Sequence, residues 1–501
     1  MSLLAVDIGS SACKAVAFAT TGEILARHSS GYTPEFPQTS FAEIDPQIFW
    51  DAVCSCCRAV ARDLASPVQA LCFSSHGETF VAVDSHGTPL RRAILNQDGR
   101  AVREATLCEE LMGRERLFHI TGLQTHPMYT LPKILWLREH EPEIFASTRS
   151  FLTLIGFLLE KMGLPPYVDY SLASRFLAFD IRKRCWSSEI LSATGLDESR
   201  LPVPAPAGTI AGKLGSEAAG QLGVPAGCPV VLGGHDQPCS ALGTGVIGGG
   251  RVSDSLGTYE CLLAASEAPS LNEKALQASL NTYCHVVPAK FVTLAYFPSG
   301  IMVKWFHDLL YANGAGTGGT DPAGGELESA HYEFLESHVP AGPTGLGITP
   351  HLIGTCNPEF NPRARGLISG LNPGTGRAHI YKGILEGIAC ELVVVAEALA
   401  GAVGGFDDIY VTGGGTRSAL GLQLRAAFTG RRLHVMSQQE AVCLGTAILG
   451  GVAIGEYASV EQAIAALVSE SRVVNPDAGL TESYRHQLRQ YRQLRSAAVQ
   501  A

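Results

Sequence analysis

Apolar runs that lead into glycine or an acidic side chain recur along the chain. The run Leu3 to Val6 leads directly into Asp7, and the run Val230 to Leu232 leads through two glycines towards Asp236. Short apolar runs with such ends are typical of buried strands. In open α/β sheets, ligands bind beyond the carboxyl ends of the strands. The pattern therefore predicts an α/β fold in which acidic side chains lie at the ligand-binding edge of a sheet. Asp236 is the main candidate among them.

Two further predicted strands end in polar groups. The strand Ala70 to Ser74 is followed by His76 and Glu78, and the apolar pair before Asn96 leads to Asp98. The same rule makes these side chains candidates for contact with a polar ligand. A lone histidine in such a place is often a structural residue whose ring nitrogens have partners inside the protein, so both interpretations stay open for His76.

Helical periodicity separates the predicted strands. Apolar residues recur every three to four positions after Asp45 and Pro46, a pair that suits a helix N-cap and first turn. Helices are also predicted over 301–311, 381–403 and 419–429. The second of these carries three glutamates, which predicts a core helix rather than a membrane span. The glycine-rich stretch 313–325 predicts a mobile loop.

The chain contains a candidate internal duplication. Ile8 to Ser11 and Leu256 to Thr258 both consist of an apolar residue, a glycine and a hydroxyl residue before a predicted strand. Such turns offer backbone N–H groups and hydroxyls to a phosphate. At 501 residues the chain is also too long for a single core. We therefore expect two domains, over 1–244 and 245–455, that clamp a nucleotide between them, followed by a helical extension over 456–501.

A third glycine-rich turn points to the nucleotide itself. Gly413 to Gly415 lie between a predicted strand and a predicted helix, so the backbone can approach a nucleotide at a helix N-terminus. The spacing is not GxGxxG, and the ribose carboxylate expected of a dinucleotide site is missing. A dinucleotide-dependent oxidoreductase is therefore disfavoured.

Composition and charge narrow the class of protein further. The net charge of −10, with no cluster of lysine and arginine, argues against nucleic acid as a partner. The 14 cysteines show no metal-type spacing, and a helical pattern predicts that Cys54, Cys56 and Cys57 are buried. Many cysteines without a secretory signal predict a reducing cytoplasm. No segment is predicted to bind or cross a membrane.

In their order and separations, the motifs resemble those of the FGGY carbohydrate kinases, the family of glycerol kinase and xylulokinase. Each motif alone is of moderate specificity, but the resemblance extends over nearly the whole chain, from about residue 3 to residue 455. The matching segments are Asp7 to Ser11, Ile94 to Arg100, Asp169 to Ser174, Gly233 to Gln237, Ser255 to Thr258, Asn361 to Gly366, Gly413 to Ser418 and Glu440 to Ala447.

The resemblance implies a fold and a chemistry. It implies an α/β protein with two actin-like (ribonuclease H-like) ATPase domains and a central catalytic cleft, which uses ATP and Mg²⁺ to phosphorylate a small sugar or polyol. Asp236 would be the general base, and Asp7 would hold the Mg²⁺. The implied substrate-binding residues are His76, Glu78, Asp98 and Gln237. The implied ATP-binding residues are Ser10, Ser11, Lys14, Gly257, Thr258, Gly300, Gly414, Gly415 and Ser418.

The resemblance leaves the substrate open. Gly77 stands where glycerol kinases carry an arginine, which favours a ketopentose such as xylulose over glycerol or another polyol. Two rivals belong to other classes. A non-kinase actin-like ATPase would not need the polar groups around Asp236, and a sugar sensor without catalysis would be expected to lose Asp7 or Asp236. Neither the phosphorylated hydroxyl nor any regulation follows from the sequence; a homodimer is common in the family.

Overall fold

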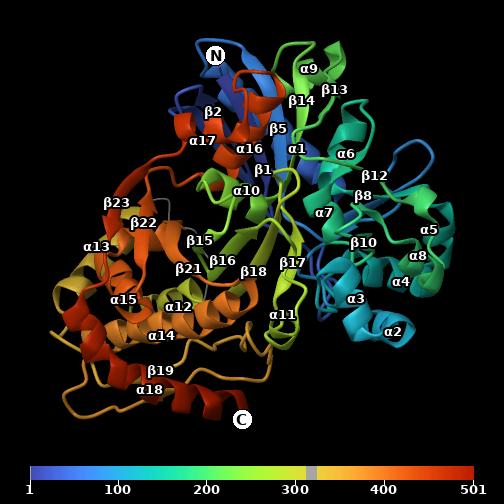
Figure 1. The fold of residues 1–501 in the computed structure, drawn as a ribbon. Helices are drawn as coiled ribbons and strands as arrows, with labels where there is room; N and C mark the ends of the chain where they lie inside the picture. The colour runs from blue at the N-terminus through green and yellow to red at the C-terminus, as the bar shows by residue number, and fades with distance from the viewer. Residues whose placement is uncertain (1, 312–323, 501) are drawn as a thin grey trace.

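The computed structural model describes residues 2–311 and 324–500. Within these ranges the chain forms two large mixed sheets with helices packed around them (Figure 1). The α/β class predicted from the apolar runs is therefore confirmed. The stretch 313–325, predicted to be a mobile loop, lies outside the described residues except for its last two positions.

The first sheet is built from the N-terminal half of the chain. Over the described ranges it has six strands in the order β13-β14-β5-β1-β2-β3. β1 is antiparallel to β2 and β2 to β3, whereas β5 is parallel to both β1 and β14. The strands are β1 (Ser2–Ile8), β2 (Ala12–Ala19), β3 (Ile24–Gly31), β5 (Val68–Ser75), β13 (Ile210–Lys213) and β14 (Pro229–His235).

The second sheet repeats this arrangement in the C-terminal half. β15 is antiparallel to β16 and β16 to β18, whereas β21 is parallel to both β15 and β22. The series β3-β2-β1-β5-β14 thus corresponds strand for strand to β18-β16-β15-β21-β22, which confirms the predicted internal duplication. The strands are β15 (Gly250–Leu256), β16 (Tyr259–Ser266), β17 (Asn281–Cys284), β18 (Phe291–Pro298), β21 (Phe406–Thr412), β22 (Arg432–Met436) and β23 (Glu470–Val474).

A smaller sheet in the N-terminal half positions two predicted substrate residues. β6 begins two residues after Glu78, and β7 ends four residues before Asp98. These two strands pair antiparallel, with Phe80 opposite Ile94, so Glu78 and Asp98 both lie beyond the same end of this strand pair. The strands of this sheet are β4 (Glu43–Ile44), β6 (Phe80–Val83), β7 (Ala93–Ile94) and β8 (Ser150–Thr153).

Helices cover the sheets, and the predicted ones form. The Asp45 side chain caps the first helix by accepting a hydrogen bond from the Gln47 N–H. The helices used below are α1 (Pro46–Arg62), α4 (Thr130–His140), α6 (Leu154–Lys161), α7 (Tyr170–Ser174), α9 (Ser216–Leu222), α10 (Asp236–Gly243), α12 (Gly300–Tyr311), α13 (Gly324–Ser337), α14 (Arg377–Val403), α15 (Ala419–Thr429), α16 (Ala441–Ala453), α17 (Val460–Leu467) and α18 (Ala478–Gln500). Over the described ranges, none of the helices has the length and apolar character needed to span a bilayer.

Helix α16 comes late in the chain but packs on the first sheet, as its red ribbon beside the blue strands shows (Figure 1). A Cβ atom at Gly450 would lie 2.1 Å from the Cys72 sulfur on β5. A Cβ atom at Gly445 would lie 1.9 Å from the carbonyl oxygen of Cys239 on α10. These glycines let α16 approach both neighbours closely, so the helix that begins at Asp236 is braced by the C-terminal half of the chain.

The segment 456–501 was expected to be a helical extension. It contains α17 and α18, but also β23, which pairs with β22 at the edge of the second sheet. Ala463 and Leu467 of α17 pack with the core of the first sheet. Helices α16 and α17 therefore pack on the first sheet, and the chain then returns to the second sheet at β23.

Candidate active site

Three parallel strand ends bring the predicted catalytic groups together. In the register of the first sheet, Asp7 lies opposite Ser74, and Ser74 lies opposite Gly234. Asp236 follows β14 directly as the first residue of α10. The carboxyl ends of β1, β5 and β14 thus form one edge, as the strand-end rule predicted.

The environment of Asp236 suits a proton acceptor. Its side chain keeps 22% exposure. Removal from water raises the pKa of Asp236 well above its usual value, and the negative charges of Asp7 and Glu78 raise it further. Although His235 Nε2 lies 3.2 Å from Asp236 Oδ1, this oxygen has no hydrogen-bond partner within the protein, and neither has Oε1 of Gln237.

Asp7 lies beside Asp236 with a partner of its own. The Ser74 hydroxyl donates to Asp7 Oδ1 over 2.9 Å, while burial raises the pKa of Asp7 to about 6. The described residues contain no cluster of three or more His, Cys, Asp or Glu side chains arranged to hold a metal ion. A single carboxylate fits Mg²⁺ that takes its other ligands from water and phosphate oxygens.

Glu78 forms a buried ion pair that the sequence analysis did not foresee. Arg175 Nε donates to Glu78 Oε1 over 2.6 Å, and Arg175 Nη2 lies 2.5 Å from the same oxygen. The backbone around Glu78 is in the left-handed region, with φ 64°, and Lys133 Nζ donates to its carbonyl oxygen over 2.8 Å. Arg175 immediately follows the Asp169 to Ser174 motif, so an extension of that motif by one residue would have found it.

His76 lies near the strand end, but both ring nitrogens have partners. Nδ1 donates to the carbonyl oxygen of Ile8 over 2.9 Å, and the Thr79 hydroxyl donates to Nε2 over 2.7 Å. Burial lowers the pKa of His76, which favours the neutral ring. This geometry favours the structural interpretation, in which His76 joins β1 to the segment that carries Glu78.

Both carboxylate oxygens of Asp98 likewise accept hydrogen bonds from neighbouring residues. Arg100 donates from Nε to Asp98 Oδ1 over 2.9 Å and from Nη2 to Oδ2 over 2.8 Å. The Ala42 N–H donates to Oδ2 as well, over 2.6 Å. Asp98 is also buried. The geometry therefore favours a role in holding the loop after β7 rather than direct contact with a substrate.

The first hairpin presents two exposed hydroxyl residues and one lysine. Ser10 and Ser11 lie exposed at the turn between β1 and β2, in keeping with a phosphate-binding role. Lys14 on β2 does not extend freely into the site: its Nζ lies 2.7 Å from Glu440 Oε2 at the start of α16. The predicted ATP contact of Lys14 would require this ion pair to open or to be shared.

The remaining predicted ATP-binding residues surround one hollow in the C-terminal half. This pocket of about 500 Å³ is lined by residues of β15, α12, α13, α14 and the turn after β21. A pocket of this size is within the range of small-molecule sites. The predicted residues that line it are Gly257, Thr258, Gly300, Gly414, Gly415 and Ser418.

Close backbone contacts shape this pocket. The Gly300 N–H donates to the carbonyl oxygen of Gly257 over 3.1 Å, and a Cβ atom at Gly300 would lie 2.4 Å from that oxygen. The N-terminus of α12 therefore abuts the second hairpin, and the Ile301 N–H also donates to this hairpin, at the carbonyl oxygen of Thr258. On the other wall, the Ser418 hydroxyl donates to Glu336 Oε1 over 2.5 Å. The described part of the pocket thus fits a nucleotide.

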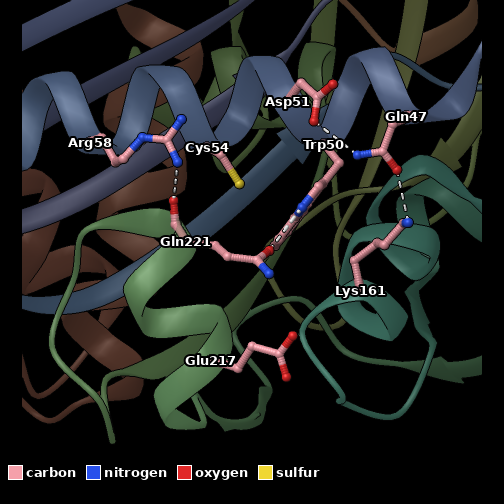
Figure 2. Close-up of a pocket in the computed structure, with 8 residues that line it drawn as sticks. All are labelled: Gln47, Trp50, Asp51, Cys54, Arg58, Lys161, Glu217 and Gln221. Carbon is pink, nitrogen blue, oxygen red and sulfur yellow. Dashed lines mark hydrogen bonds between the residues drawn. The ribbon is translucent and has the colours of Figure 1, made fainter.

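A second hollow in the N-terminal half lies apart from the strand ends. It measures about 590 Å³ and lies between α1, α6 and α9 (Figure 2). Its side chains bond to one another: Trp50 Nε1 donates to Gln221 Oε1, and Lys161 Nζ donates to Gln47 Oε1. Asp7, Ser74 and Asp236 do not line it, so it is separate from the side chains gathered at the strand ends.

Comparisons with known proteins agree with the duplicated fold. The model of the FGGY carbohydrate kinase N-terminal domain matches residues 2–243, and that of the C-terminal domain matches residues 252–454. A xylulose kinase of Escherichia coli (strain K12) is 28% identical over 98% of this chain and 98% of its own length. A glycerol kinase of Thermus brockianus is 31% identical over 90% of both chains. The crystal structure of a gluconate kinase from Lactobacillus acidophilus superposes with a TM-score of 0.89, at 20% identity over 99% of this chain and 98% of that one.

Proposed function

The chain belongs to the FGGY family of carbohydrate kinases, and from that premise we propose that it transfers the γ-phosphoryl group of ATP to a hydroxyl of a ketopentose such as xylulose. Kinase activity towards a sugar or polyol follows from the family. The proposal further includes the identity of the sugar and the roles of single residues. It also includes the division of the chain into domains at 1–244, 245–455 and 456–501.

One observation carries the proposal. Buried polar atoms without a partner in the protein gather around the strand-end carboxylate, and such atoms are rare because each one costs free energy. The atoms are His235 Nδ1, Asp236 Oδ1, Gln237 Oε1, Arg175 Nη1 and Tyr283 Oη. A molecule that carries several hydroxyl groups would satisfy donors and acceptors of this kind together.

The chemistry assigned to these residues is positioning and proton removal. In phosphoryl transfer the protein mainly aligns the reactants and neutralises charge. Asp236 accepts the proton of the attacking hydroxyl, and the burial that raises its pKa makes its carboxylate a stronger base. Gln237 orients the sugar. Asp7 would hold Mg²⁺, and bound Mg-ATP would supply the phosphoryl group between the two hairpin turns.

The Gly77 position supports a ketopentose less strongly than the sequence suggested. A Cβ atom at Gly77 would lie 2.9 Å from Cγ of Arg175. An arginine is therefore supplied next to Glu78 by the residue that follows α7, Arg175, and not by position 77. This observation favours a second candidate function, the phosphorylation of glycerol or another polyol, on the same catalytic groups.

A panel of acceptors tests the proposal. ADP release is measured through a coupled NADH assay with D-xylulose, other ketopentoses, ketohexoses, pentitols and glycerol. Asp236→Asn is assayed beside the wild type, and Asp63→Asn, which changes an exposed aspartate at the end of α1, is the matched control. We expect turnover with one neutral sugar that is abolished in Asp236→Asn and kept in Asp63→Asn. ADP release that needs no sugar and survives Asp236→Asn would instead indicate a non-kinase ATPase.

A further inference from the structure

The ion pair between Arg175 and Glu78 is enclosed from several sides. The two side chains are only 4% and 3% exposed. The guanidinium carbon of Arg175 lies 5.1 Å from the ring centroid of Tyr129 and 4.9 Å from that of Tyr283. Tyr129 precedes α4 in the N-terminal half, and Tyr283 lies on β17 of the second sheet. Both halves of the chain thus hold this guanidinium in one place.

The pair uses only part of its hydrogen-bonding capacity. Nε and Nη2 of Arg175 both approach Glu78 Oε1, whereas Nη1 is buried without a partner. The ring of Tyr283 also contacts the ring of His235, with centroids 5.6 Å apart, and His235 directly precedes the proposed base. The pair therefore borders the group of unpartnered atoms to which we assign the substrate.

We propose that the Arg175–Glu78 pair is the element that selects a neutral substrate with neighbouring hydroxyls and rejects one with a carboxylate. The inference rests on the proposed kinase function and adds the chemical class of the acceptor. A hydroxyl can donate to the Glu78 carboxylate while its neighbour accepts from Arg175 Nη1. The pair thus matches two adjacent hydroxyls of a sugar or polyol.

A carboxylate in the same place would meet a different balance of charge. Arg175 is already neutralised by Glu78, so an aldonate such as gluconate would bring a second negative charge into the same enclosed space. Like charges held close together in a buried site are strongly disfavoured because water cannot screen them. The Glu78 side chain is therefore the repulsive element, and Arg175 is the cation that it keeps occupied.

The test is a selectivity switch in the intact protein. D-xylulose, glycerol and D-gluconate are compared by kcat/KM in the wild type and in Glu78→Gln, which frees Arg175 to pair with a carboxylate. We expect the wild type to prefer the better neutral substrate over gluconate by about a hundredfold or more. In Glu78→Gln we expect this ratio to fall by about a hundredfold, because kcat/KM for gluconate rises while that for the neutral substrate falls.

Two further variants distinguish a specific effect of the Arg175 guanidinium from a general loss of folding or activity. The double variant Glu78→Gln/Arg175→Met removes both charges and should lose the neutral sugar without gaining gluconate. Arg182→Met, which changes an exposed arginine outside the site, should leave kcat/KM for all three compounds unchanged. ADP affinity, measured by calorimetry, reports the fold independently, because the nucleotide pocket is built from other residues.

The possible outcomes distinguish a failure of the proposed selectivity from a failure of the proposed kinase function. Silence of the wild type towards every neutral acceptor would overturn the proposed function. Turnover of gluconate by the wild type as efficient as that of the neutral sugar would overturn only the inference, as would an unchanged ratio in Glu78→Gln with ADP affinity intact. If Glu78→Gln loses ADP binding, the variant Arg175→Lys is tested instead. The proposed selectivity requires that its KM for the sugar rises about tenfold while its KM for ATP stays unchanged. An unchanged KM for the sugar would contradict the proposal.

Discussion

Lys14 on β2 and Glu440 at the start of α16 form an ion pair of 2.7 Å across 426 positions of sequence. Arg27 on β3 lies 3.6 Å from the other carboxylate oxygen of Glu440. The pair joins the first hairpin turn, where we place the ATP phosphates, to the helix that braces Asp236. A residue assigned to ATP from its position in a motif is thus held by the opposite half of the chain.

Breaking this ion pair from its two ends should have opposite effects on ATP binding. The Lys14 side chain is 43% exposed, so Lys14→Met and Glu440→Gln should each change the free energy of unfolding by less than about 1 kcal/mol. Lys14→Met removes the cation and should raise the KM for ATP, whereas Glu440→Gln releases the cation and should lower it. Steady-state kinetics at saturating sugar measures both, and equal weakening of ATP binding in the two variants would show that the pair is purely structural.

Asp169 should make the protein less stable as the pH rises from 3.8 to about 6. It caps α7 by accepting from the Ser171 and Leu172 N–H groups, and burial raises its pKa from 3.8 to about 6. The folded state therefore binds more protons than the unfolded state between these values, so stability falls with rising pH in that window. The loss for this one group is about 2–3 kcal/mol.

Asp169→Asn should remove this contribution to the pH dependence. Urea unfolding of the wild type and the variant at pH 4.5 and pH 7 measures it, and the comparison is the difference between the two proteins at each pH. We expect the variant to gain relative to the wild type at pH 7. A difference that is the same at both pH values would show that Asp169 is ionised throughout.

Gly300→Ala should weaken ATP binding. The added methyl group would lie 2.4 Å from the Gly257 carbonyl oxygen, so the N-terminus of α12 must move away from the second hairpin. Overpacking of this kind costs about 1–3 kcal/mol, and if this cost falls on the nucleotide complex it corresponds to a rise of about fivefold to a hundredfold in the ATP KM. Gly220→Ala is the matched control, because a Cβ atom on this α9 glycine meets nothing within 4 Å; a similar KM in both variants would contradict the assigned pocket.

Gly445→Ala should disturb catalysis from a distance. Its methyl group would lie 1.9 Å from the Cys239 carbonyl oxygen, which forces α16 away from the helix that begins at Asp236. We expect a loss of stability of about 1–3 kcal/mol or more and a lower kcat with little change in the KM for ATP. Thermal unfolding and steady-state kinetics measure these effects, and an unchanged kcat would show that Asp236 does not depend on the position of α16.

Much of the site could be predicted from short-range pattern. Asp7 and Asp236 follow apolar runs, and the parallel register of β1, β5 and β14 then places them at one edge. Whereas the role of Gly300 followed only from the family resemblance, Gly257 could be found because a tight turn favours a residue without a side chain. The repeated hairpin was visible as a repeated motif for the same reason.

The partners of charged side chains could not be predicted in this way. His76 and Asp98 stand at strand ends as expected, yet their hydrogen bonds go to the Ile8 carbonyl and to Arg100. Tyr283, in the other half of the chain, reaches Arg175 without any sequence signal that links the two. Which polar group satisfies which depends on distances between elements that are remote in sequence.

The amino-acid order alone decided where strands end and which acidic groups stand there, because alternation, glycine turns and helix caps are properties of a few consecutive residues. The packing of α16 and β17 across the two halves decided which of those groups are left without a partner. A buried charge is neutralised by whatever the fold brings within about 3 Å of it, and that neighbour is set by tertiary contact. Arg175 is therefore a partner of Glu78, and Asp236 is left open to a substrate, for reasons that only the assembled molecule contains.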